Sequence, residues 1–260
     1  MVDDGSRHIR VLHVLEQLAA TQYPQTLAQL AQRTGLPKTS LMRMLRSLEQ
    51  TAHVTRLPGD MGYVPGPYAH YLAVRLLQTP HFQRACRHVL GKLIAVTGEA
   101  CNLTAPAGDA VHYLARVESP DQMRLQLHME IGAHVPIHCT ASGKLFLAFM
   151  QDAHRTQLLN RVVLDPLTPK TITDRDSLDK ELRRIRAQEI GVDDEEFIRG
   201  MVAIAVPVKD AHGQVLAAVA CHAATAQKSL HELLEYKDAM KAAAGEMAAV
   251  FQGTERLDQG

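Results

Sequence analysis

The chain has 260 residues, of which 46% are hydrophobic, so it can bury one large core or two ordinary ones. Its 28 basic and 28 acidic residues cancel, and it has no Trp and only 4% aromatic residues, which argues against a stacking platform for single-stranded nucleic acid. The four cysteines form no CxxC pair, which is typical of reduced thiols. With no signal segment and no membrane-spanning run, we expect a cytoplasmic protein without a membrane partner.

The first part of the chain follows the order of a winged helix-turn-helix. Leucine and isoleucine recur at helical spacing over residues 7–20, which predicts a first helix. A short helix over 27–33, a Gly-Leu-Pro turn, a second helix starting near Lys38 and a ribbon over 54–64 come next. In this motif the helix after the turn is the one that enters the major groove of DNA.

That second helix has two chemically different faces. One face is apolar and carries Leu41, Leu45 and Leu48. The other carries hydroxyl and guanidinium groups suited to phosphate oxygens and base edges, and Thr39 or Ser40 is expected to cap the helix. Residues 7–66 hold seven Lys/Arg and three Asp/Glu, a net charge of +4. An ordinary hairpin with a solvated basic face is the alternative, but the full order of elements favours DNA contacts by Arg33, Lys38, Thr39, Ser40, Arg43, Arg46, Ser47 and Arg56.

A Pro-Gly-Pro sequence at 65–67 interrupts the chain, and residues 68–78 predict a helix that links two domains. We therefore expect a DNA-binding domain over 1–66, a linker helix over 67–80 and a second domain over 81–260. In the second domain the patterns predict helices over 82–96, 143–150, 152–161, 177–188 and 230–251. They predict strands over 101–105, 110–117, 123–129, 201–208 and 214–222. This arrangement indicates an α+β fold.

Two blocks of the second domain carry a family resemblance. The first reads GAHVPIHCTASGKLFLA over 132–148, and the second reads IGVDDEE over 190–196 and continues as IAVPV over 204–208. With the winged helix, they resemble the IclR-type bacterial transcriptional regulators over about residues 8–251. The resemblance implies a GAF-like α/β effector-binding domain, a double-stranded DNA operator, and homodimers or homotetramers. It also implies a small organic effector, a carboxylate or aromatic acid, that controls a catabolic operon, with no catalytic residue, metal or cofactor.

In such regulators the effector cavity is lined by the loop before the Gly-Lys helix, the start of the acidic segment and the last strands. Carried over to this chain, those positions are Ala141, Ser142, Asp193, Ala203, Ala220 and His222. Many relatives have Cys at the position of Ala203 and small hydroxyl residues at the positions of Ala220 and His222. A partly charged His222 imidazole is a candidate partner for a carboxylate, and a purely structural histidine is the alternative.

The other two positions have competing interpretations. Backbone amides at the start of a helix attract an anion near Ser142, although simple capping by Thr140 or Ser142 explains the same residues. The acidic run that starts with Asp193 reads as a solvated loop when it is taken alone. An aspartate in the cavity repels an anionic effector unless it accepts a hydrogen bond from an effector hydroxyl or acid proton.

Two other classes of function use some of the same residues. An enzyme would draw an acid–base pair from residues 193–196 with His138 or His222, and a nucleophile from Cys139 or Cys221, but no GxSxG, HExxH or CxxC motif organises them. A metal-responsive regulator would use His134, His138, Cys139, Cys221 and His222, yet no pair has zinc-ligand spacing on one helix face.

Overall fold

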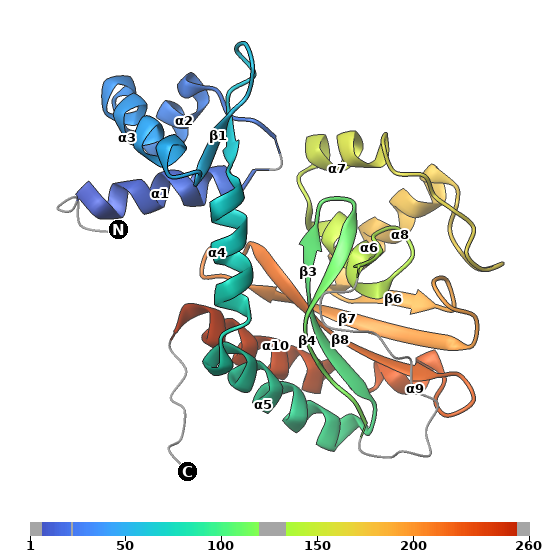
Figure 1. Cartoon of the computed structure of the whole chain (residues 1–260). Helices are drawn as coiled ribbons and strands as arrows, with labels where there is room; N and C mark the ends of the chain where they lie inside the picture. Colours follow the sequence, from blue (N-terminus) through green and yellow to red (C-terminus); the bar gives the residue numbers. More distant parts are fainter. Residues whose placement is uncertain (1–6, 22, 120–133, 254–260) are drawn as a thin grey trace. The chain divides into compact units, whose positions relative to one another are not determined.

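The computed structural model describes residues 7–21, 23–119 and 134–253. The chain divides into two compact units, Met1–Thr79 and Pro80–Gly260. Figure 1 shows the helices of the first unit in blue to teal and the mixed helices and strands of the second in green to red. The predicted α+β class, with an N-terminal winged helix-turn-helix, is confirmed. Among the described residues, no helix combines the length and the apolar character needed to cross a membrane.

In its described part, the first unit consists of four helices and a two-stranded hairpin: α1 (Arg7–Ala19), α2 (Leu27–Thr34), α3 (Lys38–Gln50), β1 (Val54–Arg56), β2 (Tyr63–Pro65) and α4 (Pro67–Leu77). Its core joins α1, α2 and α3 to β1 through Val14, Leu18, Leu30, Leu41, Met44, Leu45, Leu48 and Val54. The predicted apolar face of α3 is therefore the face that packs inward.

The expected cap of α3 is wrong. The N-cap residue is Pro37, and it makes no side-chain capping bond. Thr39 and Ser40 lie inside the first turn, beyond the position from which a hydroxyl can accept from the free amides. By contrast, Thr26 caps α2 in a reciprocal capping box with Gln29.

Over residues 80–119 and 134–253, the second unit is a six-stranded antiparallel sheet with helices on both faces. Its strands are β3 (Ala100–Ala107), β4 (Ala110–Val117), β5 (His134–Pro136), β6 (Gly191–Asp194), β7 (Met201–Lys209) and β8 (Val215–Ala224). They lie in the order β5-β4-β3-β8-β7-β6. Its helices are α5 (Pro80–Thr97), α6 (Ala141–Phe149), α7 (Asp152–Leu159), α8 (Arg175–Gln188), α9 (Leu230–Leu234) and α10 (Lys237–Gln252).

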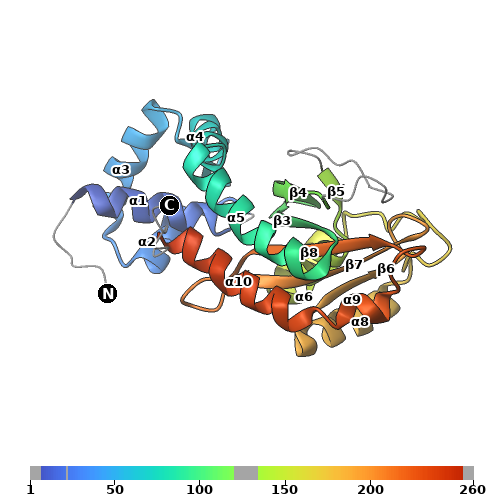
Figure 2. The same cartoon turned by 90° about the horizontal axis from the view of Figure 1, so that it is seen from below.

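Helices α5 and α10 pack side by side on one face of this sheet, and α6 packs with α8 on the other (Figures 1 and 2). A core cluster fills the space between the sheet and α6, with Leu145 and Leu147 of α6 and Leu182 and Ile185 of α8 all buried. The strand residues facing α6 include Ala205, Ala218 and Ala220, whose small side chains let this helix lie close to the sheet.

Three expectations for the second unit differ from the structure or fall outside it. The short strands β5 and β6 were not predicted, because runs of three or four residues carry little alternation. The predicted strand over 123–129 lies outside the described residues. The prediction of a single final helix is wrong, because the chain leaves helical geometry at Tyr236 between α9 and α10. The hydroxyl of Tyr236 accepts from Lys228 Nζ at 3.0 Å, and no Gly or Pro marks this break in the sequence.

Gly191 lies where β6 passes directly beside α6. A Cβ atom at this position would lie 2.1 Å from the backbone oxygen of Ala141 and 3.0 Å from the Cβ of Leu145. The backbone oxygen cannot rotate away, so any side chain must push the strand from the helix. Only glycine permits this approach of the strand to the helix.

We expect Gly191→Ala to lower the free energy of unfolding of the full chain by about 1–3 kcal/mol, because the added methyl group overpacks this contact. Urea unfolding followed by circular dichroism measures the change. The matched control is Gly245→Ala, at a position in α10 where no atom lies within 4 Å of the added Cβ. That control should stabilise the chain slightly, since alanine favours a helix, and equal effects of the two variants would contradict the proposed close packing.

Candidate binding cavity and basic helix

The outward face of α3 is a polar and basic surface. Of the eight residues predicted to contact DNA, Ser40 is partly buried and the other seven are exposed. The residues come from three elements: Arg33 lies at the end of α2, Arg56 at the end of β1, and the rest on α3. Arg33 Nε donates to Gln17 Oε1 at 3.2 Å, and Arg43 and Arg46 are exposed on α3. The helix thus presents two guanidinium groups opposite its buried leucines.

A cavity in the second unit lies between the sheet and the start of α6. Its empty volume is about 510 Å³, including space open to solvent. The structure brings all six carried-over effector positions to this cavity. The full lining is Asn102, Thr104, Val111, Tyr113, Val135, Thr140, Ala141, Ser142, Asp193, Phe197, Ile198, Met201, Val202, Ala203, Ala220 and His222.

Strand register explains why distant residues meet at the cavity. Asp193 of β6 is the cross-strand partner of Ala203 of β7, which is the partner of His222 of β8. Directly paired residues point to the same face of an antiparallel sheet, so these three side chains form one row across the cavity floor. The middle of the row is an alanine, and Ala220 is two residues before His222, so small side chains leave space between the polar ends.

The start of α6 forms the opposite wall. Thr140 Oγ1 accepts from the backbone N–H of Gly143 at 3.1 Å and donates to the oxygen of Pro136 at 2.7 Å. Thr140 is therefore the N-cap, as one of the two alternatives for this segment expected. Ser142 has a different role, since its hydroxyl accepts from Thr104 Oγ1 at 3.0 Å at the cavity lining.

Asp193 is buried, with 6% of its surface exposed. Its Oδ1 accepts from the backbone N–H groups of Glu196 at 2.8 Å and Phe197 at 3.3 Å. Burial outweighs these hydrogen bonds and raises the pKa of Asp193 to about 7. Near neutral pH this carboxyl is therefore protonated in much of the population and can donate a hydrogen bond, which removes much of the expected repulsion of an anion.

The expected charge on His222 is wrong. Burial, together with the guanidinium of Arg116, lowers the pKa of His222 to about 3, so its imidazole is neutral at physiological pH. Arg116 Nη2 lies 3.3 Å from His222 Nε2, and Asn102 Nδ2 lies 3.2 Å from His222 Nδ1. The cation at this end of the cavity is Arg116, whose side chain is 5% exposed.

Sequence reasoning missed both Asn102 and Arg116. They are cross-strand partners on β3 and β4, and Arg116 Nη1 donates to Asn102 Oδ1 at 3.0 Å. The signal available in the sequence was an amide and an arginine within two otherwise apolar strands. An arginine is almost never fully buried without a partner, so the two could have been expected to pair. The pairing of β3 with β8 that brings them to His222 is not visible in the sequence.

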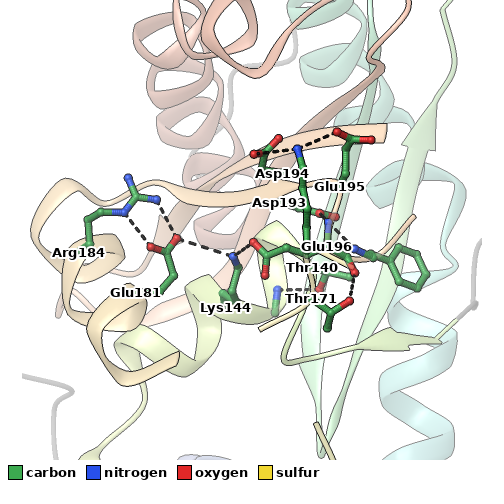
Figure 3. A network of polar contacts seen from close by, with 12 residues as sticks. Thr140, Lys144, Thr171, Glu181, Arg184, Asp193, Asp194, Glu195 and Glu196 are labelled. Atoms are coloured by element: carbon green, nitrogen blue, oxygen red, sulfur yellow. Dashed lines mark hydrogen bonds and ion pairs between the residues drawn. The ribbon is translucent and has the colours of Figure 1, made fainter. Parts of the chain in front are cut away.

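The acidic segment is a structural anchor rather than a solvated loop. Lys144 of α6 is fully buried and pairs with Glu196, and Glu181 Oε1 of α8 lies 3.7 Å from Lys144 Nζ. Figure 3 shows this chain of contacts from Arg184 through Glu181 and Lys144 to Glu196. The two acidic residues between Asp193 and Glu196 bind Lys170 instead.

The residues that an enzyme or a metal site would use are buried or make other contacts in the structure. Burial raises the pKa of the Cys139 thiol to about 12, which opposes a nucleophilic thiolate. His138 Nε2 lies 3.2 Å from the backbone oxygen of Asp165, and Cys221 is buried opposite Cys101 in the sheet. Within the described ranges, no group of three or more His, Cys, Asp or Glu side chains is placed to hold a metal ion.

Comparison with known proteins decides the family. The family model described as Bacterial transcriptional regulator IclR C-terminal matches residues 74–249, and the model described as IclR helix-turn-helix domain matches residues 9–58. The chain belongs to the IclR family of DNA-binding transcriptional regulators. The resemblance inferred from its two sequence blocks is confirmed.

Individual relatives agree with this assignment. The "Probable transcriptional regulator SauR" of Cupriavidus necator is 37% identical over 243 residues, covering 94% of this chain and 96% of that protein. The Pca regulon regulatory protein of Pseudomonas putida is 30% identical over 210 residues, covering 81% and 71%. A crystal structure of a double mutant of the PobR inducer-binding domain from Acinetobacter, in complex with 3-hydroxybenzoic acid, matches with a TM-score of 0.60 and 27% identity, covering 64% of this chain and 97% of that one.

The raised pKa of Asp193 makes stability depend on pH. Between the ordinary value of 3.8 and about 7, the folded IclR-family chain keeps a proton that the unfolded chain has lost. The contribution of this group to the free energy of unfolding is thus complete at low pH and is lost as the pH rises towards 7. Asp193→Asn stays neutral and keeps the oxygen that accepts from Glu196 and Phe197.

We expect the stability of Asp193→Asn relative to the wild type to increase by roughly 1–3 kcal/mol between about pH 5 and about pH 8. Urea unfolding of both proteins at the two pH values gives this difference. Asp109→Asn, at an exposed turn, is the control and should show no such change. Parallel pH profiles for wild type and Asp193→Asn would contradict a buried carboxyl with a raised pKa.

Proposed function

We propose that this IclR-family regulator binds its operator through α3 and that a small organic acid in the cavity controls this binding. The observation that carries the proposal is that four separate segments of the sequence bring the six carried-over positions to one cavity. A largely apolar lining with a few placed polar groups is typical of a small-molecule site. The complex of the related PobR domain with 3-hydroxybenzoic acid supports an acid as the ligand class.

The proposed division of labour assigns residues 1–66 to DNA binding, 67–80 to a linker helix, and 81–260 to effector binding and oligomerisation. The boundary between compact units at Thr79 and the helix α4 over Pro67–Leu77 support this division. An effector shifts operator binding only if its affinity differs between two arrangements of the protein, and a tenfold difference is worth about 1.4 kcal/mol.

Arg43 is the proposed base- or phosphate-contacting residue at the middle of α3. It is exposed, and its helix is fixed from behind by Leu41, Leu45 and Leu48. The proposed partner is double-stranded DNA, since a single recognition helix fits the major groove of a duplex.

We expect Arg43→Ala to weaken operator binding by about 1–3 kcal/mol, because it removes a guanidinium contact without altering the core. Fluorescence anisotropy measures this on duplex DNA selected by the wild-type protein from a random-sequence library. Arg161→Ala, an exposed arginine of the second unit, is the control and should bind as the wild type does. Unchanged binding by Arg43→Ala would sink the assignment of α3 as the recognition helix.

For the effector, we expect 3-hydroxybenzoate or a short aliphatic hydroxy acid such as lactate to raise the Tm of the full chain. A ligand at a hundredfold excess over its Kd adds about 2.7 kcal/mol to the free energy of unfolding. The same acid should change the affinity for the selected DNA. Ser142→Ala should keep DNA affinity but lose most of both responses, since Ser142 lies in the cavity lining.

Leu147→Ala serves as the control for general loosening, because Leu147 is buried behind the cavity in the α6 core and does not line it. It should lower Tm yet keep the ligand-induced shift. If Ser142→Ala responds to the acid as fully as the wild type, the cavity is not the effector site.

Self-association is proposed to use α4. This helix has no buried residue, and five of its apolar residues are each more than 40% exposed: Tyr68, Tyr71, Leu72, Val74 and Leu76. Three of these, at 68, 72 and 76, are spaced by four residues and share one helix face. A contiguous apolar stripe of this kind is typical of an interface, and a second copy of the chain in a homodimer or homotetramer is its proposed occupant.

Sedimentation velocity of the Leu72→Glu variant tests this proposal, and a shift towards monomer is the expected result. The control is Val163→Glu, a change at an exposed apolar residue of the other unit. A shift towards monomer in the control as well would count against α4 as the interface.

A further inference from the structure

The phenol of Tyr113 is a buried polar group that the carried-over effector positions do not include. Tyr113 lies on β4 and lines the cavity, and 9% of its surface is exposed. Its hydroxyl makes no hydrogen bond to any residue that the structure describes. Because a buried tyrosine hydroxyl usually has a hydrogen-bond partner, this one has a capacity that the described protein does not use.

The hydroxyl oxygen of Tyr113 is in contact with open space. In the described part of the chain, Glu196 Oε2 is a carboxylate oxygen that is sealed from solvent without a partner, and it is not in the cavity lining. The hydroxyl of Tyr113 also has no partner, yet it is not sealed in this way. Since the rest of this side chain is buried and lines the cavity, the open space beside its hydroxyl is the cavity.

The phenol of Tyr113 remains a hydrogen-bond donor at physiological pH. Burial raises the pKa of Tyr113 above its ordinary value of 10.0, and this effect is larger than the opposing one of the Arg116 guanidinium. The carboxyl of Asp193 also raises this pKa, so the phenol and the carboxyl are within electrostatic reach of each other. Tyr113 therefore offers a neutral donor to the same space that Asp193 lines.

Two other groups of the lining have unused capacity as well. The hydroxyl of Ser142 accepts from Thr104 Oγ1 at 3.0 Å, and its own proton has no acceptor among the described residues. Oδ1 of Asp193 accepts from two backbone N–H groups, whereas its Oδ2 has no hydrogen-bond partner in the described chain. Together with Tyr113, these groups reach the cavity from three separate elements, α6, β6 and β4.

The cavity lining holds no cation. Of the described residues that form it, none is Lys or Arg, and His222 is neutral at physiological pH. The positive end of the α6 helix dipole, in the turn that contains Ser142, is therefore the part of the lining that attracts a carboxylate. Tyr113 is on β4 instead, where Val111 and Val135 are neighbouring lining residues. A ligand that uses both walls needs a carboxylate and a second oxygen.

We propose that Tyr113 determines the specificity of the cavity by donating a hydrogen bond to a second oxygen of the effector, outside the carboxylate held at the start of α6. The effector class is then a small hydroxy or oxo acid rather than an unsubstituted acid. This inference rests on the proposed function, because it names the class of acid that the cavity accepts. An acid with an apolar group facing Tyr113 leaves the buried hydroxyl without a hydrogen bond and binds more weakly.

The Tyr113→Phe variant removes only the hydroxyl. We expect its Tm without a ligand to stay within about 1 °C of the wild-type value, because no described protein group loses a hydrogen bond. The matched control is Tyr236→Phe, the same change at a hydroxyl outside the cavity lining that accepts from Lys228 Nζ at 3.0 Å. That control should lower Tm by about 2–4 °C. An equally large fall in Tyr113→Phe overturns the premise of an unused hydroxyl.

Binding to the full chain is then measured by isothermal titration calorimetry with acids that differ in one oxygen: 3-hydroxybenzoate against benzoate, and lactate and pyruvate against propionate. We expect the wild type to bind at least one substituted acid more tightly than its parent acid. Tyr113→Phe should bind that substituted acid about three- to tenfold more weakly and bind the parent acid as the wild type does. Tyr236→Phe should keep the wild-type preference.

Ser142→Ala should give a different pattern from Tyr113→Phe. It should weaken binding of the parent acid and of the substituted acid by a similar factor, because Ser142 lies at the start of α6, where the carboxylate common to both is proposed to bind. If Ser142→Ala instead loses the preference for the substituted acid and Tyr113→Phe keeps it, the second oxygen does not lie at Tyr113.

The outcomes separate the two proposals. A preference for the substituted acid that persists in Tyr113→Phe overturns the role of Tyr113 and leaves effector binding in the cavity intact. A wild-type chain that binds benzoate and propionate as tightly as the substituted acids overturns the effector class as well. A wild-type chain that binds none of these acids overturns the proposed effector function together with this inference.

Discussion

The buried ion pair between Lys144 and Glu196 is the contact on which the cavity depends. It joins α6 to the turn after β6, and both of its partners are more than nine-tenths buried. A buried charge is tolerated only with a partner, so removing Lys144 leaves the buried carboxylate of Glu196 uncompensated, a change that costs about 3–5 kcal/mol. Because Ser142 is two residues before Lys144 and Asp193 is three before Glu196, this one pair sets the separation of two cavity walls. Gly191 permits the same approach on the backbone side.

The two ends of the cavity carry different polar groups. Burial raises the pKa of the Asp193 carboxyl and lowers the pKa of His222, which keeps the imidazole neutral. The positive charge near this end of the cavity therefore belongs to Arg116. Ala203 and Ala220 leave the floor between these ends without hydrogen-bonding side chains. The result is a cavity with polar side chains at its two ends and small apolar side chains between them.

The two units rely on different physics for their proposed roles. In the first, a core of leucine, valine and methionine holds α3 so that its basic face meets solvent, and function needs surface charge rather than a cavity. In the second, a sheet covered on both faces supplies rigid positions for groups from separate segments of the sequence. Membership of the IclR family fits this combination of an exposed basic helix in the first unit and a cavity beside the sheet in the second.

Local patterns in the sequence were sufficient for the winged helix-turn-helix, because its helices and turns are marked by leucine spacing, Gly35 and Pro37. The two motif blocks were sufficient to identify the family, and they indicated Ser142 and Asp193 as effector positions. Only the tertiary structure decided the state of the cavity's groups, because a pKa reports burial and neighbours that local sequence does not contain. Arg116 is 106 residues from His222 along the chain, and their contact follows from the pairing of β3 with both β4 and β8. Because of this long-range strand register, His222 lies beside the buried guanidinium of Arg116, and its imidazole is neutral rather than charged.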